Sequence, residues 1–178
     1  MGWKAVRDHY RIEHFVQVTD AGICIGSPYI HDIIVVSVDR GEIVRRWDGI
    51  RSNSDLERYL EEMDADPVKL AELVAADDVF ERSIPVYTYE GGDIIEKQCE
   101  ALGYPNVTHD GCMQYENTFS PDAELVRTWA IANAQAGIEW MREALEQTEK
   151  TRAEQSHRLA QREHDLRRLT ERDRKPST

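Results

Sequence analysis

Two His-Asp pairs are the side chains of this sequence best suited to chemistry. His31-Asp32 and His109-Asp110 both stand in turn-like segments, and imidazole and carboxylate groups are ligands for zinc, iron or manganese. With His9 and His14 they could assemble the metal site of a metal-dependent hydrolase. No two histidines have the H-x-x-x-H or H-E-x-x-H spacing that places two ligands on one helix face. We therefore expect loop polar groups here and predict no metal site, with the hydrolase as an alternative.

The other patterns that signal catalysis are missing from the sequence. Cys24 lies between two isoleucines of an expected strand, so we expect a core side chain, and nothing near Cys112 indicates a lowered thiol pKa. The segment Gly22–Ser27 lacks the lysine of a P-loop and the third glycine of a dinucleotide fingerprint. No G-x-S-x-G motif occurs. We therefore predict no catalytic residues and no cofactor, and favour a protein that is not an enzyme.

Aromatic and amide side chains are concentrated in two predicted loops, around residues 29–32 and 104–118. Such residues are typical of recognition surfaces, because aromatic rings give contact area at a low entropic cost. Alternatively, Tyr104 and Tyr115 are core side chains with solvated hydroxyls. The residues predicted to bind a ligand or partner are Tyr29, His31, Asp32, Asn106, His109, Asp110, Tyr115 and Asn117.

Charge divides the chain unevenly. Residues 1–149 hold 13 Lys and Arg against 29 Asp and Glu, a net charge of −16, whereas residues 150–178 hold 9 against 5, a net charge of +4. The acidic part would repel nucleic-acid phosphates, so direct nucleic-acid binding by that part is disfavoured. The basic C-terminal tail could bind nucleic acid or an acidic protein surface. Both regions could also be ordinary solvated surface.

These residues must be positioned by an α+β fold. Residues 12–47 predict an antiparallel β-meander of three or four short strands, in which the β-branched stretch 32–38 is central. Helices are predicted behind a capping box at Ser54–Glu57 and behind Asp66-Pro67. Further along, the patterns predict an edge strand over 84–89, a third helix over 93–103, and a loop over 104–120 with a short strand at 112–115.

A long C-terminal helix is the last predicted element. Ser120-Pro121-Asp122 is a helix start, and the next proline is Pro176. Heptads counted from Ile131 give a patchy coiled-coil seam whose polar positions cluster at residues 148–155 and at Arg162. We predict an acidic domain over 1–120, a dimerising helix over 121–174 and a disordered tail over 175–178. The predicted homodimer interface comprises Ile131, Ile138, Met141, Leu145, Leu159, Leu166 and Leu169.

Neither a membrane span nor a secretion signal is evident. No apolar run approaches the roughly 18 residues that cross a bilayer, and the first residues lack the apolar stretch of a signal peptide. Three widely spaced cysteines do not form a disulfide framework or a zinc site. We expect a protein of the cytoplasm that does not bind membranes.

Three segments, Gly22–Asp32, Gly103–Gly111 and Tyr115–Thr118, resemble those of small uncharacterised accessory proteins of tailed phages and prophages. The resemblance covers about residues 1–145. It implies a phage-encoded protein in the host cytoplasm that binds and modulates a host protein, such as a defence factor. We therefore expect a non-enzymatic interaction protein, dimerised by its C-terminal helix, that binds a host or phage protein through its acidic surface. The alternatives are a small-molecule or nucleotide-sequestering protein and the metal-dependent hydrolase.

Overall fold

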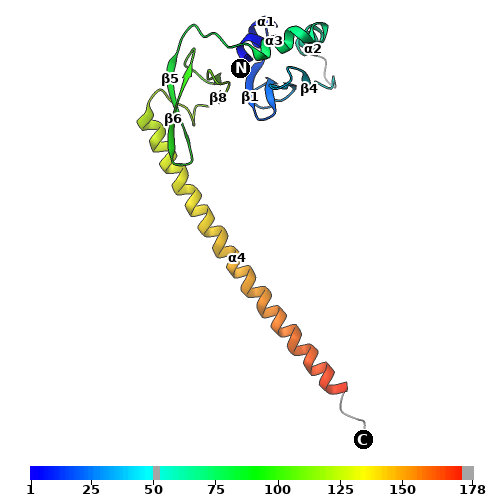
Figure 1. Ribbon diagram of the computed structural model, residues 1–178. Helices are drawn as coiled ribbons and strands as arrows, with labels where there is room; N and C mark the ends of the chain where they lie inside the picture. Colours follow the sequence, from blue (N-terminus) through cyan, green and yellow to red (C-terminus); the bar gives the residue numbers. More distant parts are fainter. Residues whose placement is uncertain (50–52, 174–178) are drawn as a thin grey trace. The chain divides into compact units, whose positions relative to one another are not determined.

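The computed structural model describes residues 1–49 and 53–173, and the side chains as far as residue 170. The chain divides into two compact units, Met1–Ala130 and Ile131–Thr178. The first unit combines antiparallel sheets with short helices, and the long helix α4 (Ala123–Asp173) begins in it and continues into the second unit. The predicted α+β class, with a small meander and a long C-terminal helix, is confirmed (Figure 1).

A four-stranded antiparallel meander begins the fold, in the order β1-β2-β3-β4. The β-branched residues of β3 are all buried, which explains the interior position of that strand between β2 and β4. The predicted central strand is therefore confirmed, although it is shorter than residues 32–38. The strands are β1 (Phe15–Thr19), β2 (Gly22–Gly26), β3 (Ile34–Val36) and β4 (Ile43–Arg45).

Three short helices cover one side of this sheet (Figure 1) and complete the main core. The helix α1 (Trp3–His9) was not predicted, although its buried residues Trp3 and Val6 are followed by the buried Tyr10 at helical spacing. The helix α2 (Ser54–Ala65) is capped by Asn53, whose side chain accepts the Asp55 and Leu56 amides, and not by Ser54 as predicted.

The helix α3 (Pro67–Ala75) begins as predicted. Its cap Asp66 accepts the amide of Lys69, and Pro67 occupies the first turn, where no amide donor is needed. Leu70 and Val74 face the core. The main core is made of Trp3, Val6, Tyr10, Ile12, Val16, Ile23, Ile25, Ile34, Val36, Leu56, Tyr59, Met63, Leu70 and Val74.

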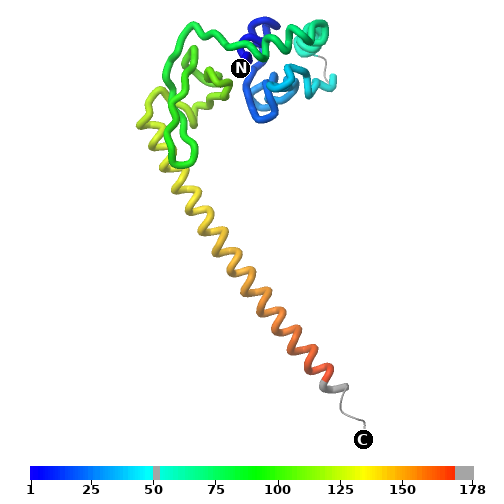
Figure 2. Tube along the Cα trace, in the orientation of Figure 1, coloured from blue at the N-terminus to red at the C-terminus, as the bar shows by residue number. Residues whose placement is uncertain are grey.

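Residues 76–83 then lead from α3 to the hairpin of β5 (Ile84–Glu90) and β6 (Asp93–Cys99), as the tube in Figure 2 shows. The helix predicted over 93–103 is wrong, because residues 93–99 pair along their whole length with β5. Gly91 has a φ of 57°, which closes the tight turn between the two strands. Cross-strand pairing thus outweighed the helix start and stop signals at Asp93 and Gly103.

The loop after β6 contains a two-stranded pair, β7 (Asn106–Val107) and β8 (Met113–Gln114), so the predicted short strand at 112–115 is confirmed. Val86, Cys99 and Phe119 form a second, small core beside this pair. The turn at Gly111 joins the loop to β1, since Val18 N donates to Gly111 O over 2.8 Å.

The helix α4 begins two residues after the predicted start. Asp122, not Ser120, is its cap, because the Asp122 carboxylate accepts the amides of Glu124 and Leu125 over 3.0 and 3.2 Å. The side chain of Val126 is buried in the first unit. The helix then runs to Asp173, against a predicted end at 174, and the predicted tail 175–178 lies outside the described residues.

Candidate functional site

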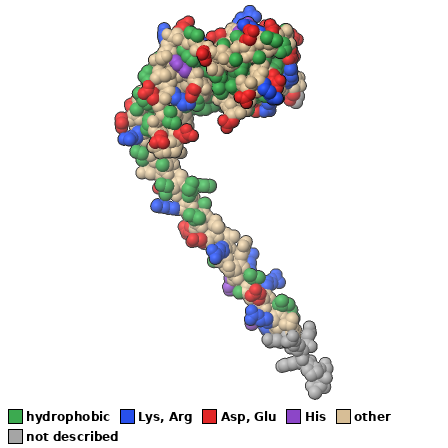
Figure 3. Space-filling view, viewed as in Figure 1, with side chains coloured by type: hydrophobic (Ala, Val, Ile, Leu, Met, Phe, Trp, Pro, Cys, Tyr) green, Lys and Arg blue, Asp and Glu red, His purple; other side chains and the backbone are tan. Residues whose placement is uncertain are grey.

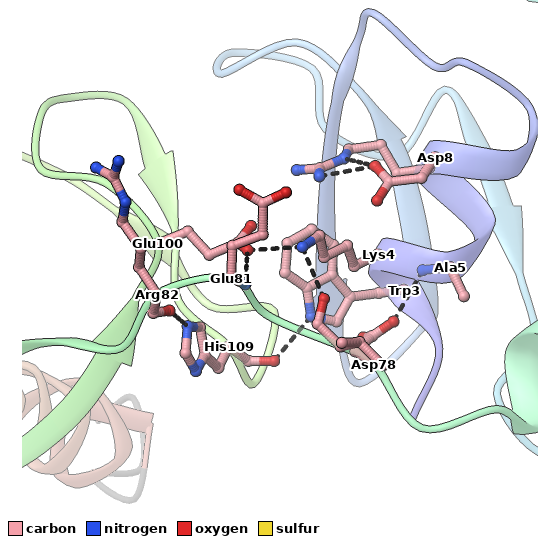
Figure 4. Close-up of polar contacts among 11 residues, drawn as sticks. Trp3, Lys4, Ala5, Asp8, Asp78, Glu81, Arg82, Glu100 and His109 are labelled. Atoms are coloured by element: carbon pink, nitrogen blue, oxygen red, sulfur yellow. Dashed lines mark hydrogen bonds and ion pairs between the residues drawn. The ribbon is translucent and has the colours of Figure 1, made fainter.

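Side chains far apart in the sequence converge where α1 meets the end of β6 (Figure 4). Lys4 is 8% exposed, and its ammonium group donates to Glu100 over 2.6 Å and to the carbonyl of Val79 over 2.7 Å. The same Glu100 oxygen accepts the amide of Glu81 over 2.7 Å. A nearly buried cation is thus bonded to acceptors from two other segments, residues 76–83 and the end of β6, which ties α1 to the second part of the unit.

Burial and these donors act in opposite directions on the Glu100 carboxyl group. Partial burial raises its pKa, but the hydrogen bonds from Lys4 and the Glu81 amide, together with the charges of Lys4 and Arg7, lower it more. The pKa of Glu100 therefore lies below its ordinary value. The carboxylate, not the carboxylic acid, is the form that this network holds.

An aromatic stack lies beside the Lys4-Glu100 pair. The rings of Phe80 and His109 are parallel, with centroids 3.7 Å apart and an interplanar angle of 5°. The ammonium group of Lys4 lies 5.1 Å from the centroid of the Phe80 ring, within the range of cation–π attraction. His109 Nε2 is 3.0 Å from the carbonyl of Arg82. Because a carbonyl only accepts, this contact assigns the Nε2 proton and leaves Nδ1 as an acceptor in the neutral ring.

A pocket of about 310 Å³ opens between β1 and the loop after β6. It lies between the four-stranded sheet and the loop 104–118. Donors and acceptors are mixed in its wall, with Arg7 beside the acids Glu13 and Glu100. The wall is formed by Trp3, Arg7, Ile12, Glu13, His14, Phe15, Val16, Phe80, Glu100, Ala101, Pro105, Asn106, Val107 and His109.

Of the eight residues predicted to bind a ligand or partner, only Asn106 and His109 line this pocket. The side chain of Asn106 donates to the Ala101 carbonyl and accepts the Val107 amide over 2.8 Å, so its amide is occupied by the loop itself. Tyr29, in contrast, is 94% exposed in the loop between β2 and β3. The other predicted residues at exposed or partly exposed positions outside the pocket are His31, Asp32, Asp110, Tyr115 and Asn117.

The two His-Asp pairs do not assemble a metal centre. Asp32 forms an ion pair with Arg45, and Asp110 forms one with Lys97 over 2.7 Å. Burial raises the pKa of Asp110, but hydrogen bonds from Lys97 and Thr108 lower it more. Among the side chains of residues 1–49 and 53–170, no three His, Cys, Asp or Glu are grouped as metal ligands. The metal-dependent hydrolase therefore lacks the convergence that it requires.

Three further expectations can be compared with the structure. Cys24 is fully buried, as expected, and burial raises the pKa of its thiol, which disfavours a nucleophile. Tyr104 and Tyr115 are 42% and 43% exposed, so the alternative that they are core side chains is wrong. An anion ligand in so acidic a unit would need a basic cluster, for which the sequence offers Arg45, Arg46 and Arg51. Arg45 is paired with Asp32 and Arg46 with Asp64, and Arg51 lies outside the described residues.

Sequence reasoning did not find Trp3, Lys4, Phe80 and Glu100, which build most of the convergent network. The first two lie on α1, which was not predicted. The spacing of Trp3, Val6 and Tyr10 is the signal that could have found this helix, because all three share one helical face. For Phe80 and Glu100 no local signal exists, since only tertiary contacts bring them to α1.

A second candidate surface runs along α4. It consists of the seven predicted interface residues, which we name the α4 seam, and each is between 49% and 64% exposed. The apolar side chains in Figure 3 recur along this helix among charged ones. The α4 seam comprises Ile131, Ile138, Met141, Leu145, Leu159, Leu166 and Leu169.

The acidic character of the first unit is spread over several elements. Met1–Ala130 holds 12 Lys and Arg against 25 Asp and Glu, a net charge of −13. The helix α2 alone carries five acidic residues and one arginine. On the face shown in Figure 3, acidic and basic side chains are interspersed, which differs from the continuous acidic stripe that imitates a DNA backbone.

Comparisons with known proteins give no relative. Scans of protein-family models, of curated proteins and of solved structures found no match to this chain. None of the described helices combines the length and the apolar character that are needed to cross a membrane.

Proposed function

We propose that this chain is a non-enzymatic interaction protein that pairs through α4 and presents its acidic first unit to a protein partner. The observation that carries the proposal is the α4 seam, in which seven large apolar side chains remain about half exposed or more. An exposed apolar stripe of this length is typical of an interaction surface. Its heptad spacing, although interrupted at residues 148–155 and 162, indicates another helix as the group that covers it.

Helix physics supports the same proposal. A helix in a protein gains most of its stability from packing an apolar face, not from intrinsic propensity. The 51 residues of α4 carry such a face at 3.5-residue spacing. Pairing with another helix would bury the α4 seam and supply the packing that the helix needs.

The charge of the first unit indicates the type of partner. A net charge of −13 favours a protein with a basic surface and disfavours nucleic acid. In the phage setting that the resemblance implies, this partner would be a host protein, such as a defence factor, whose activity the complex would modulate. Pairing through α4 would place two acidic units in one particle and increase the avidity of binding.

The test is the molar mass of the full-length chain in solution, measured by light scattering. We expect twice the mass of the chain, and we expect the Leu159→Asp/Leu166→Asp variant to have the mass of one chain, because two carboxylates would enter the seam. The matched control is Ala153→Asp/Ala160→Asp, which adds the same charges to exposed positions of α4 outside the seam. A monomeric wild type, or equal masses for the two variants, would contradict the proposal.

The pocket between β1 and the loop after β6 favours a second candidate function, the sequestration of a small molecule such as a nucleotide. Arg7 offers a charged donor in the pocket wall, which the stacked rings of Phe80 and His109 also line. The test is the unfolding temperature in the presence of a series of nucleotides, with Arg7→Met as the variant. A shift for wild type that Arg7→Met abolishes would support this function, and no shift with any nucleotide would exclude nucleotides as ligands.

A further inference from the structure

We infer that α4 pairs with the α4 of a second copy of this chain in the antiparallel orientation, with Met141 opposite Leu159. The inference rests on the proposed function, because it specifies the occupant and the orientation of the α4 seam. It depends on the charges along the helix and on the residues at the a and d heptad positions.

The two halves of the described helix carry opposite charges. Residues 131–149 contain four Glu and one Arg, a net charge of −3. Residues 150–170 contain six Lys and Arg against three Asp and Glu, a net charge of +3. A parallel pair would place like-charged halves side by side. An antiparallel pair places the −3 half of each copy along the +3 half of the other, which is attractive along the whole length.

Two arginines at a and d heptad positions are stronger evidence against a parallel pair. Arg152 is at an a position and Arg162 is at a d position of the heptads that begin at Ile131. In a parallel dimer each a residue faces the same residue of the other helix, so both arginines would meet their own copies inside the interface. Two guanidinium groups held face to face in a partly desolvated seam repel each other.

The antiparallel orientation removes these contacts, because each a position then faces a d position. With Met141 opposite Leu159, the numbers of any two facing residues add up to about 300. The two helices then overlap from residue 131 to residue 169, and the two-fold axis passes near Lys150. In this register Arg152 faces Thr148 and Arg162 faces Ile138. The long stem of Arg162 can then cover Ile138 while its guanidinium group reaches water.

The same register matches the apolar residues to one another. Three layers are apolar on both sides, and two-fold symmetry makes each of them occur twice. Apart from the Ile138–Arg162 layer, the polar seam residues lie at the centre, where Leu145 faces Gln155 and Glu149 lies next to the layer that holds the Arg152 of the second copy. The apolar layers are Ile131 with Leu169, Ala134 with Leu166, and Met141 with Leu159.

The test is disulfide cross-linking of full-length variants in a Cys112→Ser background, in which Cys24 and Cys99 stay buried. We expect Met141→Cys mixed with Leu159→Cys to form a covalent dimer of the two different variants under oxidation. Neither variant should cross-link to itself, because residues 141 and 159 are about 27 Å apart along a helix, at about 1.5 Å per residue, whereas a disulfide needs Cα atoms within about 7 Å. Trp140→Cys mixed with Leu159→Cys is the matched control, since residue 140 lies outside the seam.

The outcomes separate this inference from the proposed function. A dimer in which Met141→Cys cross-links to itself would overturn the antiparallel orientation and leave pairing through α4 intact. Cross-linking of Met141→Cys to Leu166→Cys, and not to Leu159→Cys, would overturn the register. A full-length chain that is monomeric by light scattering would overturn both.

Discussion

The two units of this chain use similar apolar residues in opposite ways. In the first unit, Ile23, Ile25 and Ile34 have no exposed surface, and helices α1, α2 and α3 cover them. In the second unit, Leu159 and Leu166 are more than 60% exposed. The difference lies in the spacing of these residues, which alternate along short strands in one unit and recur every seven residues along a single helix in the other.

This contrast shows which part of the structure is completed within one chain. The apolar face of the four-stranded sheet is buried by helices of the same chain, so the stability of the first unit should not depend on protein concentration. A single helix has no second surface in its own unit to cover the seam. The stability of α4 should therefore depend on association and rise with protein concentration.

The largest expected effect is in the main core of the first unit. Ile25→Ala removes a fully buried side chain from β2, and we expect a loss of about 2–5 kcal/mol in the free energy of unfolding. The matched control is Ile30→Ala, in the next loop, where the side chain is 60% exposed and we expect a change within about 0.5 kcal/mol. Denaturant titrations followed by tryptophan fluorescence measure both. If Ile25→Ala and Ile30→Ala lose equal free energy of unfolding, the side chain of Ile25 is not buried in the core as the comparison of the two units requires.

A smaller effect is expected where α1 meets the end of β6. Lys4→Met leaves Glu100 without its cation and the Val79 carbonyl without its donor, so we expect a loss of about 1–3 kcal/mol in the free energy of unfolding. The control is Lys69→Met on α3, which breaks an exposed pair with Glu72 and should cost less than about 1 kcal/mol. If the two variants lose equal stability, the Lys4 network does not join the parts of the first unit.

The sequence predicts much of the fold because many of its signals are local. Alternating and β-branched residues predict the strands of the meander, and the Asp66-Pro67 pair predicts the start of α3. The Ser120–Asp122 start and the proline-free stretch up to Pro176 predict a long helix, and its predicted end at residue 174 lies within one residue of Asp173. Prediction fails for β6, where a plausible helix start at Asp93 competes with pairing to β5 that no local pattern reveals. It also fails for α1, whose helical spacing was overlooked.

The candidate pocket was less predictable than the fold. His109 and Asn106 were found because histidine and asparagine in a loop suggest recognition, and both line the pocket. The convergence of Lys4, Phe80 and Glu100 depends on contacts between segments about 75 to 100 residues apart, as the Lys4 contacts to Val79 and Glu100 illustrate. One sequence contains no record of such contacts, so residue types could nominate single positions but not the network that surrounds them.

The smallest expected effect is the pH dependence that Glu100 adds to the first unit. Because its pKa in the folded chain is lowered from the ordinary value of 4.5, the folded state favours the carboxylate, and this contribution is present above pH 4.5. It is lost as the pH falls through the folded-state pKa. In Glu100→Gln the side chain cannot ionise. The free energy of unfolding of wild type should therefore exceed that of Glu100→Gln by the largest amount near neutral pH, and the two values should approach each other in acid.

Denaturant titrations at several pH values from about 7 to about 3 measure this difference. Glu90→Gln is the control, since Glu90 is exposed at the end of the β5–β6 hairpin and its substitution removes the same charge outside this network. The curve of Glu100→Gln should itself still fall in acid, because the pKa values of Asp64 and Asp110 are also lowered by their cationic partners. A constant difference between wild type and Glu100→Gln at all pH values would mean that this network stabilises the first unit by packing and hydrogen bonding alone, and that the charge of Glu100 contributes nothing to the link between α1 and β6.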